Sequence, residues 1–343
     1  MEYRMALKEL RDGKIKPYYI CFGTETYLMN DFIERLAGSL VEPEHRDMAI
    51  IRFSTSENGT DEILEEAQTL PFLVPSKLIL VRDSVVFAAG RDSAKVEHRP
   101  ERLLEYMSAP MDSTVLVFVV PHEKLDERKK LVKYAKDKDA VVSFAPLPAE
   151  ELMQWVARRA ESRNRRIEPP AVEELLRRVG SDMGALAAEI DKLILYAGEA
   201  GTIAADAVVQ LVPASTEQSV FKLTEEIAAL RTDRALALYY DLLKQREEPI
   251  KLTALLVRQF RNMLFVKELG KQGYTPQQMA GQLGLHPYAA KIMAEQARSF
   301  SVERLTAVLD RLAELDYGMK TGRVEKTLGL EMFLLKTGSE GGQ

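Results

Sequence analysis

Apolar residues in the first part of the chain alternate between short, mostly apolar runs and longer helical repeats. Short runs that predict strands span residues 18–22, 48–53, 78–81, 114–120 and 140–144, and the run at 78–81 is unbroken, as is typical of a strand buried on both faces of a parallel sheet. Between these runs, apolar residues recur every three or four positions, as Leu28, Phe32 and Leu36 do. A highly charged segment at 124–138 also has the pattern of a helix. Strands separated by helices at this spacing predict a mostly parallel, doubly wound α/β domain over residues 1–145.

The strand pattern ends at Phe144, and the apolar residues that follow have helical periods. Residues 146–212 predict a small helical domain, and residues 213–343 predict a larger helical bundle. The last residues, from Thr337 onward, are small and polar and are expected to be disordered. The predicted fold class is therefore α/β plus all-α.

Charge and composition narrow the classes of function. The chain carries 47 basic and 52 acidic residues, a net charge of −5, which argues against a general nucleic-acid coat. Cys21 is the only cysteine, so an internal disulfide and a multi-cysteine zinc site are excluded, in keeping with a reducing cytoplasm. Apolar runs stay well short of 18 residues. We therefore predict a cytoplasmic protein without a membrane partner.

The segment at 67–83, AQTLPFLVPSKLILVRD, holds the most informative loop of the chain. Leu70, Phe72 and Leu73 lie between a predicted helix and a predicted core strand. Pro71 and Pro75 make this connection stiff. One reading is that the Phe-Leu pair folds back to cap the sheet edge. The other is that it faces solvent and anchors a partner protein, at roughly 1.5–3 kcal/mol per side chain buried on binding. The pattern alone leaves both readings open.

The turn after the first strand is where an α/β domain binds nucleotide phosphates, because helix N-terminal amides favour anions there. A working phosphate loop needs several glycines and a Lys-Ser/Thr pair. Here the turn reads Gly23-Thr24-Glu25-Thr26, without the second glycine or the lysine. Glu25 would also place negative charge where a phosphate should lie. We therefore predict a degenerate, non-functional nucleotide site and no ATP hydrolysis.

Other catalytic patterns are missing from the sequence. His45, His98, His122 and His286 lack the spacing of metal ligands and are interpreted as ordinary surface or interface histidines. The chain has no G-x-S-x-G motif, and Cys21 lies within an apolar strand pattern typical of a core residue. No catalytic residue, metal or cofactor is predicted.

Five segments, in this order along the chain, are YYICFGTETYLMNDFIERL, TLPFLVPSKLILVRD, TVLVFVVPHEKLDERKKLVKYAK, EEPIKLTALLVRQFRNMLFVKELG and LAELDYGMKTG. Together these segments resemble the delta subunit family of bacterial DNA polymerase III clamp loaders. The resemblance implies an AAA+-like module without a working ATP site, a helical lid domain and a C-terminal collar domain. Gly184 stands where active relatives carry an arginine that senses the γ-phosphate. The Ser-Arg-Cys finger of neighbouring subunits is absent, since Ile20 precedes the only cysteine.

The resemblance also implies a mechanical role in DNA replication. Members of the family are non-catalytic subunits of the polymerase III holoenzyme that bind the ring-shaped β sliding clamp and open it. Leu70, Phe72 and Leu73 match the family's apolar wedge, which favours the solvent-facing reading of the loop. The family commonly has leucine-phenylalanine where this chain has Phe72-Leu73, so the deepest anchor stays open. The implied partners are the clamp, the tau/gamma and delta-prime subunits, and primed-template DNA, with ATP bound by the other loader subunits.

Two clusters of basic residues are candidates for DNA contacts within such a complex. They are Arg158, Arg159, Arg163, Arg165 and Arg166 in the second predicted domain, and Lys320 and Arg323 near a helix break in the third. The plain interpretation of the arginine cluster is a solvated helix end. The alternative is that it lines the chamber that follows the phosphates of the primed template.

Two other functions compete with the clamp-loader interpretation. Residues 275–287 and the helix predicted after them resemble a helix-turn-helix of a DNA-binding regulator. Its would-be recognition helix offers only Lys291 and Arg298 as basic groups, so packing within the collar is favoured. The enzyme alternative is an active AAA+ NTPase, against which the degenerate phosphate turn counts.

Overall fold

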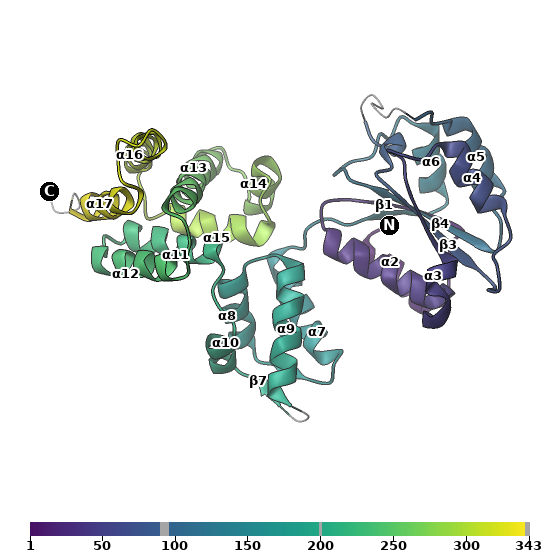
Figure 1. Ribbon diagram of the computed structural model, residues 1–343, viewed down its shortest axis with the longest axis horizontal. Helices are drawn as coiled ribbons and strands as arrows, with labels where there is room; N and C mark the ends of the chain where they lie inside the picture. The colour runs from purple at the N-terminus through teal and green to yellow at the C-terminus, as the bar shows by residue number, and fades with distance from the viewer. Residues whose placement is uncertain (90–95, 199–200, 340–343) are drawn as a thin grey trace. The chain divides into compact units, whose positions relative to one another are not determined.

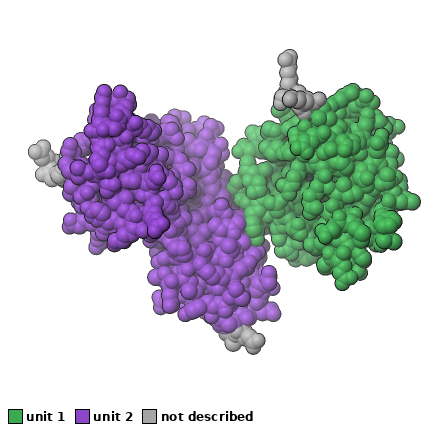
Figure 2. Space-filling model, in the orientation of Figure 1, with its two compact units in different colours: residues 1–146 green, residues 147–343 purple. Residues whose placement is uncertain are grey.

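The structure is a computed structural model that describes residues 1–89, 96–198 and 201–339. It consists of two compact units, Met1–Pro146 and Leu147–Gln343, which Figure 2 colours green and purple. The first boundary lies one residue from the predicted end of the α/β domain. The second unit contains both predicted helical groups, and their division at residue 212 stays a prediction.

The first unit is built on a five-stranded sheet in the order β2-β3-β4-β1-β5, with every pair parallel (Figure 1). The strands are β1 (Tyr18–Phe22), β2 (Ile50–Ser54), β3 (Lys77–Arg82), β4 (Thr114–Val120) and β5 (Val141–Ser143). The predicted parallel α/β fold is confirmed. β3 and β4 lie inside the sheet, which explains why their sequences are nearly continuous apolar runs.

Helices cover both faces of this sheet. They are α1 (Tyr3–Arg11), α2 (Thr26–Leu40), α3 (Arg46–Ala49), α4 (Thr60–Gln68), α5 (Pro100–Ser108) and α6 (Lys130–Asp137), with short 3-10 turns η1 (Pro43–His45) and η2 (Val85–Phe87). α4, α5 and α6 pack on one face, around Ile20, Ile79 and Leu116. α2 covers the other face, where the ring of Phe32 meets that of Tyr19 edge-on at 5.4 Å, and α1 packs on α2.

Two predicted element boundaries in this unit are wrong. α6 begins at Lys130 rather than near residue 124, because Leu125 forms an isolated antiparallel bridge with Ala88 and is held away from a helical path. The second strand begins at Ile50, and Met48 lies in α3 with its side chain exposed. In both places a tertiary contact or a short helix overrides the local apolar pattern.

The second unit is almost entirely helical. Its helices are α7 (Ala149–Glu161), α8 (Pro169–Val179), α9 (Met183–Ala197), α10 (Ala205–Leu211), α11 (Thr216–Ala228), α12 (Thr232–Lys244), α13 (Pro249–Lys271), α14 (Pro276–Leu283), α15 (Pro287–Ala297), α16 (Val302–Lys320) and α17 (Lys326–Ser339). Two short strands, β6 (Arg166–Ile167) and β7 (Thr202–Ile203), pair in parallel. The expectation that strands end at Phe144 is therefore wrong, since a two-residue strand carries no periodic signal.

The chain's last helix extends further than the sequence suggests. Thr337 is buried in α17 and its hydroxyl donates to the Phe333 carbonyl at 2.7 Å, so the expected disorder from Thr337 is wrong for 337–339. Residues 340–343 lie outside the described residues. No helix in the described part of the chain is long and apolar enough to cross a membrane.

Helix α13 organises the core shared by α11 to α17. Phe260 of α13 is fully buried and its ring meets that of Phe300 at 5.5 Å and 89°. Phe265, one and a half turns further along the same helix, is exposed. The two phenylalanines lie in the same helix but differ in burial, so replacing each in turn measures the contribution of core packing alone.

We expect Phe260→Ala to lower the free energy of unfolding by about 3–5 kcal/mol, because it leaves a cavity in a packed core. Phe265→Ala in the same helix should cost less than about 1 kcal/mol. Denaturant unfolding followed by circular dichroism measures both. Equal losses for the two variants would contradict this description of the core.

Candidate functional site

The loop between α4 and β3, residues 69–76, presents a cluster of exposed apolar side chains. Leu70, Phe72 and Leu73, called the wedge below, have 77%, 74% and 74% of their surface exposed. The solvent-facing reading of the loop is confirmed, and the reading in which Phe72 and Leu73 cap the sheet edge is wrong. The role of the wedge in binding stays a prediction.

The local sequence explains why the chain leaves the helix here. α4 ends at Gln68, and Thr69 and Leu70 follow before Pro71. A residue that precedes proline is disfavoured in helical conformation, so Leu70 turns the chain outward. Its side chain is exposed, whereas Ile63 and Ala67 on the apolar face of α4 are buried.

Leu73 has a strained backbone. Its φ is +58°, in the left-handed region that costs a bulky side chain about 1–2 kcal/mol. Such strain persists only where the surrounding structure fixes the chain, and it is concentrated at functional sites. Leu73 thus combines an exposed side chain with a strained backbone at the tip of the loop.

The base of the loop is closed by Lys77, the first residue of β3. Its side chain is almost fully buried, and Nζ donates to the Glu66 carbonyl oxygen at 2.5 Å, to Glu66 Oε1 at 2.6 Å and to Thr69 Oγ1 at 2.6 Å. The Thr69 hydroxyl in turn donates to the Glu66 carbonyl at 2.9 Å. The end of α4 is thus joined to the start of β3. The sequence analysis did not identify Lys77, although a lysine at the start of a strand buried on both faces indicates a buried, paired ammonium.

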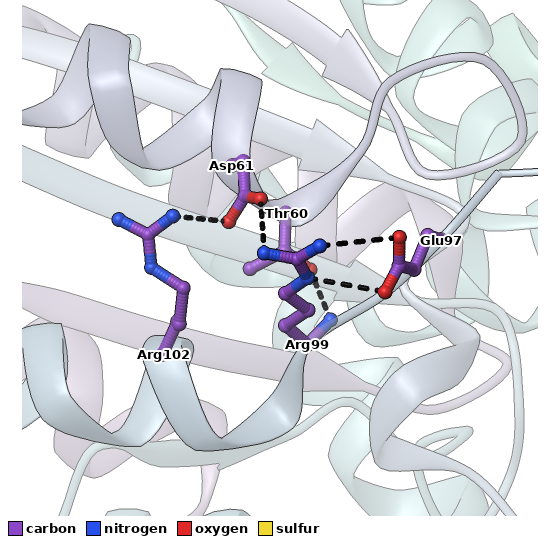
Figure 3. A network of polar contacts seen from close by, with 5 residues as sticks. All are labelled: Thr60, Asp61, Glu97, Arg99 and Arg102. Atoms are coloured by element: carbon purple, nitrogen blue, oxygen red, sulfur yellow. Dashed lines mark hydrogen bonds and ion pairs between the residues drawn. The ribbon is translucent and has the colours of Figure 1, made fainter.

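The other end of α4 is held by a surface network (Figure 3). Asp61 accepts from Arg102 Nη1 at 2.6 Å and pairs with Arg99 Nη1 at 3.1 Å, while the Arg99 amide donates to Thr60 Oγ1 at 3.1 Å. Arg99 also pairs with Glu97 at 3.1 Å. Each partly exposed pair is worth about 1 kcal/mol or less. Together they orient the start of α4 against α5.

The turn that would hold a nucleotide phosphate uses its amides elsewhere. The Gly23 amide donates to the His122 carbonyl at 3.0 Å, and the Glu25 amide donates to the Phe144 carbonyl at 3.0 Å. Phosphate binding at such a turn depends on amides that point at the ligand. These two point at protein carbonyls instead.

The glycine of this turn also has a structural role. Gly23 has φ of +128°, and a Cβ added to it would lie 2.1 Å from the Phe144 carbonyl oxygen. Thr24 is exposed, and Thr26, whose amide donates to the Thr24 carbonyl at 3.0 Å, begins α2. The glycine thus permits close contact with the end of β5, a use that needs no nucleotide.

The residues considered for other chemistry do not form a reactive site. No cluster of three or more His, Cys, Asp or Glu side chains that could hold a metal ion is found in the described ranges. Cys21 is fully buried in β1, and burial raises the pKa of its thiol, which disfavours the reactive thiolate.

The arginine cluster is spread over three different settings. Arg158 is exposed near the end of α7, whereas Arg159 is partly buried and pairs with Asp191 of α9 at 2.7 Å. Arg163 is exposed just after α7. Because its charge is largely offset by Asp191, Arg159 is the weaker candidate for a phosphate contact.

Of the remaining candidates, Lys320 and Arg323 lie near a helix break as expected, since α16 ends at Lys320 and α17 begins at Lys326. Arg166 is exposed in β6, so the interpretation of the whole cluster as a helix end is wrong at this position. Arg165 is partly buried. In the other cluster, Lys320 pairs with Asp316 at 2.6 Å. Arg323 stacks over the ring of Tyr317 at 5.2 Å.

The helix pair α14 and α15 packs into the core of the second unit. Met293 and Ala297 of α15 are buried against α13, and the buried Gln296 side chain donates to Thr224 Oγ1 at 2.8 Å. Tyr288, at the start of α15, is half-buried. A recognition helix must present its N-terminal residues to the major groove. The geometry therefore favours a packing role over base readout.

These features define a class of protein: a parallel α/β unit whose turn after β1 is hydrogen-bonded to neighbouring segments, followed by a helical unit. The α4–β3 loop exposes three large apolar side chains. Comparison with known proteins gives the family.

The family description "DNA polymerase III, delta subunit" matches residues 19–145, and "DNA polymerase III delta subunit, C-terminal domain" matches residues 217–337. The DNA polymerase III subunit delta of Bacillus subtilis (strain 168) is 36% identical over 329 residues, which cover 96% of this chain and 95% of that protein. The solved structure of the Bacillus subtilis DNA clamp loader delta protein superposes with a TM-score of 0.81 at 35% identity, covering 98% and 99% of the two chains. The chain belongs to the DNA polymerase III delta subunit family of clamp loaders.

We expect Gly23→Ala to lower the free energy of unfolding by about 2–4 kcal/mol, from backbone strain and overlap with Phe144. Gly13→Ala is the matched control, because Gly13 also has positive φ, +72°, but no described atom lies within 4 Å of an added Cβ. It should cost only about 1 kcal/mol. Thermal and denaturant unfolding compare them, and equal losses would contradict the packing role of Gly23.

Proposed function

We propose that this delta subunit binds the β sliding clamp through its wedge and holds the ring open for loading onto primed DNA. The observation that carries the proposal is the exposure of Leu70, Phe72 and Leu73 on one stiff loop. Clustered apolar side chains on a rigid support are the usual anchors of a protein interface. Their positions match the wedge implied by the family resemblance.

The free energy of burying the wedge is large enough to favour an open ring without covalent chemistry. Burying each wedge side chain is worth roughly 1.5–3 kcal/mol. A shift from 1:99 to 99:1 between closed and open clamp needs about 5.5 kcal/mol of differential binding. Three anchors reach this range only if the pocket that receives them forms mainly in the open clamp, since equal binding to both states shifts nothing. The wedge would therefore select the open ring.

We further propose that the chain is a non-catalytic subunit, with ATP bound by other loader subunits such as tau/gamma. The closed phosphate turn supports this, because the Gly23 and Glu25 amides are already paired with protein carbonyls. An active AAA+ NTPase would have to break both hydrogen bonds to bind a phosphate. No cofactor is needed by the chain itself.

The last helix offers a surface for assembly with the tau/gamma and delta-prime subunits. Leu328, Met332 and Leu335 recur at helical spacing along α17, and all three are exposed. Beside them Tyr240 of α12 is also exposed, and its hydroxyl donates to Glu331 Oε1 at 2.7 Å. We assign this stripe to the collar contact between subunits.

Primed-template DNA is the remaining partner. Arg158, Arg163 and Arg166 are exposed and could meet its phosphates within the assembled loader. A chain with net charge −5 would contribute to this contact only as part of the complex. No observation favours the helix-turn-helix regulator, whose recognition helix is packed against α13.

The double variant Phe72→Ala, Leu73→Ala should weaken clamp binding about 100-fold or more, because two central anchors are lost. Its melting temperature should stay within about 2 °C of the parent, since both side chains are exposed. Leu195→Ala, which removes an equally exposed leucine from α9, is the control and should bind normally. Surface plasmon resonance with immobilised clamp gives the affinities. Unchanged binding by the double variant would refute the wedge.

The double variant Leu328→Ala, Met332→Ala should enter a loader reconstituted with tau/gamma and delta-prime about tenfold less efficiently, owing to lost apolar burial. Its affinity for the clamp should be unchanged. Val209→Ala on α10 serves as the exposed apolar control. Size-exclusion chromatography of the reconstituted mixture measures incorporation. Full incorporation of the α17 variant would exclude this stripe as the collar contact.

A further inference from the structure

The buried ammonium of Lys77 is unusual for a residue so close to an exposed loop. Lysine is almost never fully buried unless it is paired, yet Lys77 is only 2% exposed. An ammonium has three donors. All three have an acceptor here: the carbonyl and carboxylate oxygens of Glu66 and the hydroxyl of Thr69.

The three acceptors of Lys77 lie at the C-terminal end of α4. Glu66 lies in the last turn of α4 and Thr69 is its C-terminal cap, whereas Lys77 begins β3. The last carbonyls of a helix lack intrahelical partners and carry partial negative charge, so a cation is favoured there. Lys77 thus caps α4 from the neighbouring strand and closes the eight-residue loop at 69–76, which carries the wedge.

Lys77 is itself anchored to the sheet. Its backbone amide donates to the Ser113 carbonyl at 2.9 Å, and its Cα is in register with Thr114 of the central strand β4. Lys77 therefore joins the end of α4, through its ammonium, to the sheet, through its backbone amide. A loop fixed at its base loses less conformational freedom when its tip binds a partner.

We propose that Lys77, with Glu66 and Thr69, is a positioning group that holds the wedge in its binding-competent conformation. This inference rests on the proposed function of the wedge. Lys77 itself is buried and does not touch the clamp. Its contribution is preorganisation: without it the end of α4 frays, the loop samples many conformations, and the strained φ of Leu73 relaxes.

The first test is Lys77→Met, which removes the charge itself and so leaves no unpaired ammonium in the core. We expect clamp affinity to fall about 10- to 100-fold, in proportion to the freedom regained by the loop. Hydrogen–deuterium exchange of the full-length protein should accelerate in residues 69–76 and little elsewhere. Lys129→Met is the matched control, because Lys129 Nζ donates to the Val86 and Ala88 carbonyls at 2.8 and 2.7 Å, away from the wedge. It should bind the clamp normally.

A second pair of variants acts at an exposed position and does not endanger the fold. Thr69→Val keeps the side-chain shape but removes the hydroxyl acceptor, and should weaken clamp binding about fivefold. Thr69→Ser keeps the hydroxyl and should restore the affinity of the parent. If Thr69 contributed only to overall stability, Thr69→Val and Thr69→Ser would bind the clamp with the same affinity.

The outcomes distinguish the positioning role of Lys77 from clamp binding by the wedge. In the Phe72→Ala, Leu73→Ala background, Lys77→Met should cause no further loss of clamp affinity. If Lys77→Met and Lys129→Met weaken binding equally, or if Lys77→Met binds like the parent, the positioning role is overturned while the wedge stands. If the Phe72→Ala, Leu73→Ala variant alone binds normally, the proposed function fails instead.

Discussion

Water disfavours exposed apolar surface, and the α4–β3 loop keeps three large apolar side chains in water. Folding would ordinarily bury Leu70, Phe72 and Leu73, each at a gain of roughly 1.5–3 kcal/mol. The base of the loop is joined to β3 by the Lys77 ammonium, and two prolines limit the path of the chain. Folding does not gain the free energy of burying these three side chains, so a partner that buries them can gain it. The proposed function rests on this free energy.

The same unit closes the turn at which an α/β domain would bind a nucleotide phosphate. The turn after β1 is closed by hydrogen bonds from Gly23 and Glu25 to the ends of neighbouring segments. A phosphate-binding turn must keep its amides available and adapt to its ligand. Here the amides strengthen the sheet that carries β3, and β3 carries Lys77. The turn lies beyond the C-terminal ends of β1, β4 and β5, whereas Lys77 lies at the N-terminal start of β3, at the opposite end of the sheet.

Much of the fold could be predicted because its elements are long and periodic. The limits of β1 and β4 agree with the sequence pattern, whereas β6 and β7 are too short to leave one. The exposure of Phe72 was undecided from its pattern, since an apolar residue in a loop packs or protrudes according to what the tertiary structure places beneath it. The burial of Lys77 could not be predicted for a similar reason, because its contact with Glu66 forms across the loop.

The central claim is that the wedge enters a pocket of the clamp. The most direct measurement places the photoreactive amino acid benzoylphenylalanine at position 72 in the full-length subunit and identifies its cross-links to the purified β clamp by mass spectrometry. The account predicts strong cross-links to one apolar pocket of the clamp, and none from the same probe at position 195. Absence of cross-links from position 72 while the two proteins still form a complex would contradict it.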